Sequence, residues 1–191
     1  MVGTLDWIPA LERRDLLAEP VADALARLAD IGTGATGLGA AGDVLVAEID
    51  PDLADTAAFC ARYDVPLDIS ANCVVLAAKR EGTRQLAACV VLATTRADVN
   101  GVARRMLDAR KASFAPMDAA VAESRMEYGG ITPIGLPAAW PLLVDAAVAS
   151  ADRVVVGSGV RRSKLLLPGT LLAQLPDAVI LEGLGLPAPL A

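Results

Sequence analysis

The sequence of 191 residues contains no histidine and only two residues each of Trp, Tyr and Phe. The absence of histidine removes the commonest zinc ligand, the usual general base and one member of the Ser-His-Asp triad. Any catalysis must therefore use backbone groups, carboxylates, Lys, Ser, Thr or water. Because 54% of the residues are hydrophobic but only 3% are aromatic, the core must be built from Ala, Val and Leu, which suits closely packed helices and strands.

Other shortages narrow the class of protein. No apolar run reaches the roughly 18 to 20 residues of a membrane-spanning helix, and no basic region followed by an apolar stretch marks the N-terminus for secretion. The three cysteines, Cys60, Cys73 and Cys89, lack metal-site spacing, and we interpret them as buried free thiols in a reducing cytosol. The net charge of −6 argues against a broad duplex-binding face but leaves a local contact with one nucleic-acid end open. We expect a cytoplasmic protein without membrane span, metal or cofactor.

Hydrophobic periodicity predicts one mixed α/β domain. Two helices are expected within residues 9–29, where the leucines have helical spacing and Pro20 can start the second helix. Two β-rich runs, residues 72–78 and 85–93, flank the polar segment 79–84, which predicts a hairpin at the centre of the sheet. The other expected strands are residues 44–49, 142–144, 153–156 and 178–181, and the other expected helices are residues 53–63, 98–107, 116–124 and 171–175.

Residues 32–37, Gly-Thr-Gly-Ala-Thr-Gly, match the GxGxxG pattern of dinucleotide-binding folds. That motif requires a strand before its first glycine and a helix after its last. Here a predicted helix precedes the glycines, so we interpret the segment as a loop.

Residues 128–137, Tyr-Gly-Gly-Ile-Thr-Pro-Ile-Gly-Leu-Pro, hold three glycines and two prolines. The glycines permit positive φ and let a ligand approach the main chain, while Pro133 fixes its own φ and biases Thr132 toward an extended shape. Exposed N–H groups along such a loop can bind an ester or carboxylate oxygen. The pattern fits equally a wall of a small-molecule pocket and an ordinary tight connection between helix and strand.

Residues 154–164 form a β-rich run that ends in Gly157-Ser158-Gly159, followed by Arg161, Arg162 and Lys164. Backbone amides of the turn and the three cations are candidate ligands for a phosphate. The alternative is a solvated turn whose cations offset nearby acidic residues.

Five segments together indicate a family: Thr56-Ala-Ala-Phe-Cys with Val65-Pro66, Lys111-Ala-Ser-Phe-Ala-Pro, Gly129-Gly-Ile-Thr-Pro-Ile-Gly, Leu143-Val-Asp145, and Gly157-Ser-Gly-Val-Arg-Arg followed by Leu165. Their order resembles the YbaK/EbsC family, the free-standing relatives of the editing domain of bacterial prolyl-tRNA synthetases. The resemblance extends from about residue 20 to about residue 183. The glycine loop and the Gly-Ser-Gly-x-Arg segment, about 28 residues apart, are its most specific part.

The resemblance implies a mixed α/β domain with a curved, barrel-like sheet surrounded by helices. This domain would cover residues 20–184, after an N-terminal extension (residues 1–19) and before a loose tail (residues 185–191). The implied activity is hydrolysis of the ester that joins a wrong small amino acid to the 3′ end of a tRNA. The tRNA 3′ end is the implied partner, an aminoacyl-tRNA synthetase is a candidate second partner, and no cofactor is needed.

The resemblance also assigns roles to residues. It implies catalytic roles for Gly129 and Gly130, whose backbone positions the amino acid, for Asp145 after the next strand, and for the residue at position 72. Substrate binding falls to Ile131, Thr132, Pro133, Gly157, Ser158, Gly159, Arg161 and Lys164. In the family a lysine on the first hairpin strand contacts the terminal nucleotide, but Asn72 occupies this position and supplies no positive charge.

The other lysines offer no clear substitute at the level of sequence. On a regular strand, Lys79 lies on the opposite face from Asn72 and more than about 20 Å away. Lys111 and Lys164 are the only remaining lysines, and either could reach the pocket through folding.

Two functions remain open. The first is a trans-editing aminoacyl-tRNA deacylase of altered specificity, in which Asn72 hydrogen-bonds the terminal ribose and loop amides stabilise the oxyanion. The alternative is a non-catalytic module that binds a small amino acid, a nucleotide or a tRNA 3′ end. A hydrolase of another ester is less favoured, because Ser158 has neither a histidine partner nor a nucleophile-elbow sequence.

Overall fold

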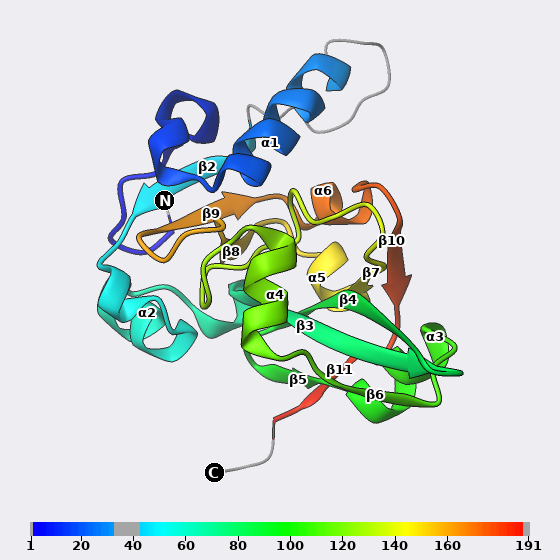
Figure 1. Cartoon of the computed structure of the whole chain (residues 1–191). Helices are drawn as coiled ribbons and strands as arrows, with labels where there is room; N and C mark the ends of the chain where they lie inside the picture. The colour runs from blue at the N-terminus through cyan, green and yellow to red at the C-terminus, as the bar shows by residue number, and fades with distance from the viewer. Residues whose placement is uncertain (1, 33–42, 189–191) are drawn as a thin grey trace.

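Three open sheets organise residues 2–32 and 43–188, the part of the chain that the computed structural model describes (Figure 1). The five-stranded sheet has the order β10 (Ala178–Leu181), β7 (Leu142–Asp145), β4 (Thr83–Leu92), β3 (Ala71–Arg80) and β6 (Lys111–Phe114). The four-stranded sheet has the order β1 (Ile8–Pro9), β2 (Leu45–Glu48), β9 (Ser163–Leu167) and β8 (Val154–Gly157), and β11 (Gly185–Pro187) pairs with β5 (Thr95–Ala97). The α-helices are α1 (Glu19–Gly32), α2 (Thr56–Tyr63), α3 (Arg104–Met106), α4 (Met117–Ser124), α5 (Ala146–Ala149) and α6 (Gly169–Ala173). Helical turns of other types are η1 (Ala10–Leu16), η3 (Pro51–Leu53), η4 (Leu67–Ile69) and η5 (Val99–Ala103).

The five-stranded sheet is mixed, since β7 runs parallel to both β4 and β10 while β3 is antiparallel to β4 and β6. The predicted α/β class is therefore confirmed, but the expected barrel-like sheet is wrong. The short strands β6 and β10 each pair with a single neighbour, so the two ends of this sheet do not meet. Within the described residues, no helix has both the length and the apolar character needed to cross a membrane.

The predicted hairpin is confirmed as β3 and β4, and it lies at the centre of its sheet. Its turn is shorter than the expected polar segment 79–84, because only Glu81 and Gly82 lie outside the strands. Both have positive φ, +47° and +85°, as in the two-residue turns that match the twist of paired strands. The ladder therefore continues to Arg80 and Thr83, and polar side chains extend to the tip.

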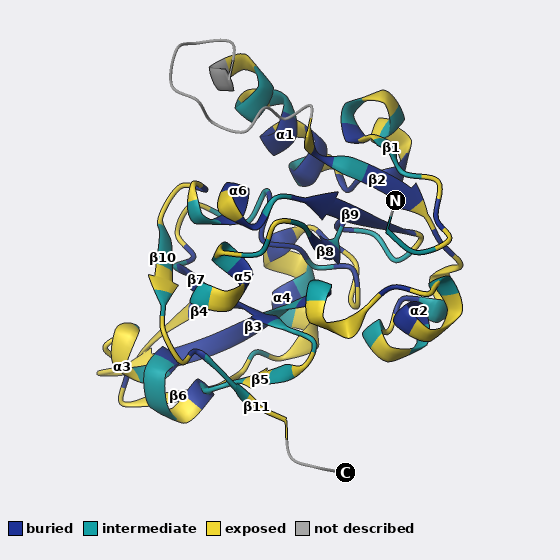
Figure 2. Cartoon of the chain, turned by 180° about the vertical axis from the view of Figure 1, so that it is seen from behind, coloured by how far each residue is buried: buried dark blue, intermediate teal, exposed yellow. Residues whose placement is uncertain are grey.

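Small aliphatic side chains fill the core, as the composition predicts. The largest cluster joins α1 to both main sheets through residues such as Val21, Leu25, Val46, Leu165 and Val144. Figure 2 shows β8 and β9 as buried strands, with exposed residues on α2 and α3. The segment before residue 20 takes part in this packing: β1 pairs with β2, and Leu16 is in the same cluster.

The remaining expected strands are confirmed as β2, β7, β8 and β10, and the expected helices lie within a few residues of α2, α4 and α6. Strand β9 was not predicted, because the sequence Arg-Arg-Ser-Lys favours a polar loop. In addition, all five residues of β9 are buried, so the strand lacks the alternation of polar and apolar residues that marks a half-exposed strand. Residues 185–187 are not loose as expected, because β11 pairs with β5 and Leu184 is fully buried. The GxGxxG segment lies largely outside the described residues.

Candidate functional site

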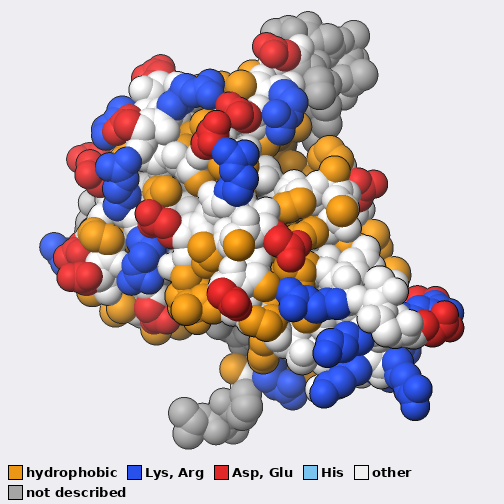
Figure 3. Space-filling model, viewed as in Figure 1, with side chains coloured by type: hydrophobic (Ala, Val, Ile, Leu, Met, Phe, Trp, Pro, Cys, Tyr) orange, Lys and Arg blue, Asp and Glu red, His pale blue; other side chains and the backbone are white. Residues whose placement is uncertain are grey.

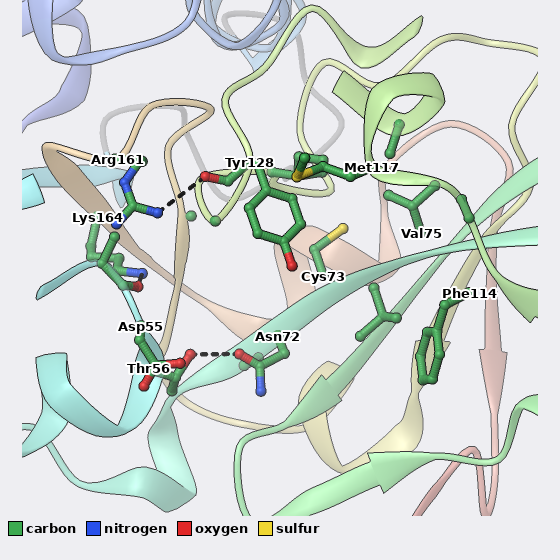
Figure 4. A pocket seen from close by; sticks show the side chains of 18 residues that line it. Asp55, Thr56, Asn72, Cys73, Val75, Phe114, Met117, Tyr128, Arg161 and Lys164 are labelled. Atoms are coloured by element: carbon green, nitrogen blue, oxygen red, sulfur yellow. Dashed lines mark hydrogen bonds between the residues drawn. The ribbon is translucent and has the colours of Figure 1, made fainter. Parts of the chain in front are cut away.

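A pocket of about 460 Å³ opens where five segments of the chain meet. These segments are the start of α2, the first half of β3, the connection from β6 to α4, the glycine loop and the strands β8 and β9 (Figure 4). Its lining comprises Ala54, Asp55, Thr56, Ala71, Asn72, Cys73, Val74, Val75, Phe114, Ala115, Met117, Ala120, Tyr128, Gly129, Ile131, Gly157, Arg161 and Lys164. The sequence-predicted residues Asn72, Gly129, Ile131, Gly157, Arg161 and Lys164 are thus brought together.

The floor of the pocket is an open edge of β3. Strand β6 pairs with β3 from Leu76 onward, so the segment from Asn72 to Val75 has β4 on one side and the pocket on the other. The carbonyl of Val75 accepts the N–H of Ala115 at 2.9 Å, which shows that this residue's backbone groups point toward the open side. By the alternation of an antiparallel strand, the backbone N–H and C=O of Cys73 point the same way.

The glycine loop is docked against the turn between β8 and β9. Glu127 donates its N–H to the carbonyl of Gly159, and Gly159 donates its N–H to the carbonyl of Gly130, both at 2.8 Å. A Cβ atom on Gly130 would lie 2.6 Å from the Val160 carbonyl carbon, and one on Gly157 would lie 2.4 Å from the Gly130 oxygen. The backbones of the two glycine motifs are in contact, so a side chain at Gly130 or Gly157 would clash with the other motif.

Gly129 presents its backbone to the pocket with a φ of +83°. Gly130 donates its N–H to Glu127, whereas no hydrogen bond within the described residues uses the N–H of Gly129 or Ile131. The loop therefore lines the pocket through Gly129 and Ile131, and its role in positioning a substrate stays a prediction. A positive φ at the wall also explains the glycine, since side chains disfavour that conformation.

The three cations of the predicted basic cluster make separate contacts. Arg161 donates to the carbonyls of Tyr128 and Pro51 at 3.3 and 2.8 Å, which ties the glycine loop to the segment before α2 (Figure 4). Arg162 donates to the carbonyl of Asp15. Lys164 is separated from the two arginines because Ser163 and Lys164 begin β9, and Lys164 enters the pocket wall instead of a surface turn.

Lys164 is a buried cation at the pocket, with 6% of its surface exposed. Its Nζ donates to the carbonyl of Ala54 at 2.9 Å and lies 5.2 Å from the centre of the Phe59 ring. Burial lowers the pKa of Lys164 from 10.5 to about 8, although Cys60 and Asp55 oppose this shift. The side chain therefore remains mostly protonated at neutral pH and supplies the positive charge that Asn72 lacks.

Asn72 lies on the floor of the pocket beside the start of α2. Its Oδ1 accepts a hydrogen bond from the hydroxyl of Thr56 at 2.6 Å (Figure 4). The amide nitrogen of Asn72 has no partner among the described residues, so it remains available to donate to a ligand oxygen.

Burial was predicted for all three cysteines and is confirmed for Cys60 and Cys89. Cys73 is only half-buried, because it lies in the pocket wall. Burial, assisted by the neighbouring Cys89, raises the pKa of the Cys73 thiol far above its usual range. A protonated thiol is a poor nucleophile. Cys73 therefore lines the pocket as a protonated thiol.

Other residues named from the sequence, Asp145 among them, lie outside the pocket lining. Asp145 accepts the N–H of Ala147 at the start of α5 and the N–H of Gly185 at the start of β11, at 3.0 and 2.6 Å. The buried hydroxyl of Ser158 bonds to Ser163 and to the Val160 carbonyl, which leaves no exposed serine nucleophile there. Gly130, Thr132, Pro133 and Gly159 are also buried and absent from the lining.

Several lining residues were missed as site residues, among them Asp55, Thr56, Phe114, Met117 and Tyr128. A signal was present for two of them, because Thr56 and Phe114 belong to segments that carry the family resemblance. Tyr128 directly precedes the glycine loop, but nothing in its residue type indicated an exposed ring at the pocket mouth.

Comparison with protein families adds an independent finding. The family model described as the aminoacyl-tRNA editing domain matches residues 50–175, which is more than half of the chain. The chain belongs to the aminoacyl-tRNA editing domain family. The matched residues include the whole pocket lining. Among curated protein sequences, none matched this chain.

Solved structures of other proteins share the fold of this chain. A protein from a study of epitope grafting onto scaffold proteins has 19% identity and a TM-score of 0.67, covering 86% of this chain and 95% of that chain. A protein described as a candidate trans-editing enzyme for prolyl-tRNA synthetase has 16% identity and a TM-score of 0.64, covering 83% of this chain and 95% of that chain. At these identities the similarity establishes the fold alone.

Proposed function

We propose that this aminoacyl-tRNA editing domain hydrolyses the ester of a mischarged small amino acid on tRNA. The observation that carries the proposal is the buried ammonium group of Lys164 at the pocket that Asn72 and Gly129 also line. Carbonyl attack on an ester creates an oxyanion, and fixed positive charge or N–H donors at that atom lower the barrier. The pocket contains both kinds of group.

The lining suggests a role for each residue. The volume of about 460 Å³ is within the usual range of small-ligand sites and suits a small amino acid with part of its nucleoside. The amide nitrogen of Asn72 donates to the ribose and the Thr56 oxygen, whose proton is bound to Asn72 Oδ1, can accept from a ribose hydroxyl. The N–H of Gly129 and the ammonium of Lys164 stabilise the oxyanion. Water adds to the ester carbon, the carbon–oxygen bond to the ribose breaks, and the ribose oxygen leaves with a proton.

Asn72 in place of lysine changes what the pocket offers the terminal nucleotide. A neutral amide hydrogen-bonds hydroxyl groups but does not attract phosphate, so we propose that substrate preference differs from that of relatives with lysine here. The cation has not been lost from the pocket in this view, because Lys164 supplies it from β9.

The direct experiment is deacylation of tRNAs charged with Ala, Cys, Ser or Pro, followed over time against buffer. We expect hydrolysis of at least one ester at catalytic protein concentrations. No hydrolysis of any ester, together with a thermal shift caused by an amino acid, nucleotide or uncharged tRNA, would replace this proposal with the non-catalytic binding module.

The Gly129→Ala variant tests the glycine loop. We expect kcat/KM to fall at least tenfold, because a side chain disfavours a φ of +83° and the new Cβ, 2.8 Å from Nη1 of Arg161, would push that guanidinium away at the pocket. The matched control is Gly82→Ala, with a φ of +85° and open space around the new Cβ. Both variants should lose about 1–2 kcal/mol of stability from the positive φ, but only Gly129→Ala should lose activity. Equal activity in the two variants would contradict a role for this backbone.

A further inference from the structure

Positive charge is concentrated in one part of this acidic chain. Residues 79–111 contain eight Lys and Arg against three Asp and Glu, a net charge of +5, whereas the remaining residues contain nine against twenty, a net charge of −11. Figure 3 shows Lys and Arg side chains gathered at the lower right, the end that carries the β3–β4 turn, β6 and α3 in Figure 1. The net charge of the whole chain therefore hides a basic surface.

Three cations form a row across adjacent strands of this surface. Lys79 on β3 lies directly opposite Arg84 on β4 and Lys111 on β6, so all three side chains extend from the same face. We call these residues the basic row. All three are exposed. Within the described residues, neither Lys79 nor Lys111 has an ion pair, and Arg84 reaches Glu123 only at 4.0 Å.

Like charges directly opposite one another destabilise a sheet. A neutral polar residue at any of these exposed positions would remove the repulsion. A ligand with regularly spaced negative charges would reverse the repulsion. A nucleic-acid strand has this property, because it carries one phosphate for each nucleotide.

The basic row is connected to the pocket by the same two strands. The distance along β3 from Asn72 to Lys79 is about 23 Å at 3.3 Å per residue, and β6 runs from Lys111 to Phe114 at the pocket. A stacked strand advances ~3.4 Å per nucleotide, so this distance corresponds to roughly seven nucleotides.

Exposed apolar side chains surround the pocket mouth beside this path. Phe114, Tyr128 and Met117, with 67%, 60% and 57% of their surface exposed, are the most exposed large hydrophobic residues described, and all three line the pocket. Aromatic rings beside a cationic surface are the usual means of holding unpaired bases, because every base has a face that stacks. The arrangement fits an RNA end better than a protein or a free nucleotide.

We propose that the basic row binds the phosphates of the RNA whose 3′ end enters the pocket, and that Tyr128 stacks on one of its unpaired bases. Tyr128 lies beside Cys73 (Figure 4), whose side chain is on the same face of β3 as that of Lys79. This inference rests on the proposed function, because it takes the pocket as the site of the aminoacyl end. It also moves the expected phosphate contacts from Arg161, Arg162 and Lys164, which are engaged internally, to the far end of β3.

The test compares two triple variants with the same change in net charge. One carries Lys79→Gln, Arg84→Gln and Lys111→Gln, and the control carries Arg14→Gln, Arg27→Gln and Arg62→Gln at exposed positions outside residues 79–111. Binding of uncharged tRNA is measured by fluorescence anisotropy between 50 and 200 mM salt, concentrations of the order at which phosphate contacts are resolved. Thermal unfolding should show the basic-row variant at least as stable as wild type, because repulsion has been removed.

We expect the basic-row variant to bind tRNA at least tenfold more weakly, with a salt slope reduced by about two to three, and the control to change less than twofold. We also expect Tyr128→Ala to weaken binding about tenfold, with Ile180→Ala, another exposed apolar residue, as its control. Unchanged tRNA binding in the basic-row variant would overturn the proposal, as would an equal loss in the control. The basic-row variant could instead keep its RNA binding and lose association with a second copy of this acidic chain. That result would also overturn the proposal, and it would indicate that the basic row binds an acidic protein.

Failure of this inference can be distinguished from failure of the proposed function by a substrate without the RNA strand. The ratio of kcat/KM for aminoacyl-tRNA to that for the aminoacyl ester of adenosine should fall at least tenfold in the basic-row variant. A fall in RNA binding without hydrolysis of either ester would support the basic row while rejecting the deacylase. Hydrolysis of the esters with an unchanged ratio would support the deacylase and reject the basic row.

Discussion

Lys164→Met is expected to lower the deacylation rate at least 100-fold and to leave the protein as stable as wild type or more stable. Loss of one group that stabilises an oxyanion typically costs a factor of 10² to 10³ in rate. The stability result has a separate cause. Lowering the pKa of Lys164 from 10.5 to about 8 corresponds to roughly 3 kcal/mol of unfavourable free energy for the buried charge, which Met does not carry.

The losses on the other side offset most of this gain. Met gives up the hydrogen bond from the charged ammonium to Ala54, worth about 1.5–3 kcal/mol, and the contact with Phe59, worth about 0.5–1 kcal/mol. Denaturant unfolding and single-turnover deacylation of the same samples measure both effects. Lys164→Arg keeps the charge and is expected to retain more activity than Lys164→Met. An active Lys164→Met variant would show that the ammonium has no part in the reaction.

Lys164 also predicts opposite pH trends for activity and stability. Its folded pKa of about 8 is below its usual value of 10.5, so between these values the unfolded chain binds more protons than the folded one. The free energy of unfolding should therefore rise with pH through this interval. Deacylation above the buffer rate should fall as pH passes about 8, because the folded ammonium loses its proton. Lys164→Met should show neither trend, and a wild-type rate that rises through pH 8 would indicate a neutral amine as base.

Gly157→Ala is expected to be the most destabilising single substitution at the pocket, with a loss of about 3 kcal/mol. Its Cβ would lie 2.4 Å from the Gly130 oxygen and 2.8 Å from the Ile131 oxygen. Both are backbone atoms, and β8 cannot move away because it pairs with β9. Overpacking of this kind typically costs 1–3 kcal/mol and sometimes more. The midpoint of thermal unfolding should fall by about 6–12 °C.

Gly183→Ala provides the control for a glycine with nothing near the new Cβ. It has a φ of +70°, so it should lose only the smaller cost of that conformation. Activity of Gly157→Ala should also be lost, even in conditions that keep it folded, because the clash separates the glycine loop from β8. Wild-type stability for Gly157→Ala would mean that the two backbones do not approach as described.

The sequence predicted local features better than contacts between distant segments. The hairpin was found because its β-rich runs and glycine turn are local. Each glycine motif was recognised as a place where side chains are disfavoured, but nothing in either segment showed that Gly130 and Gly157 exclude side chains from one another. That fact depends on two loops meeting in space.

The cations illustrate the same limit more sharply. Arg161, Arg162 and Lys164 are close in sequence and were expected to act as one cluster, yet each makes a different contact. Burial of Lys164 followed from an unpredicted strand, β9, which begins at Ser163, whereas Arg161 and Arg162 stay in the turn before it. Lys79 was excluded as a substitute for the missing lysine because it is far from Asn72. The stretch of β3 between these two residues joins the pocket to the basic row.

The open edge of β3 has a simple origin in a single imino acid. Ala115 donates the last hydrogen bond from this segment to β3, and the next residue, Pro116, has no N–H to donate and leads into α4 instead. Replacing Pro116 with a residue that can continue the ladder would allow β6 to advance along β3 toward Asn72. The capacity of the pocket is thus set by the length of a strand, so substrate size could change in this family by extending or shortening β6 while every catalytic side chain stays the same.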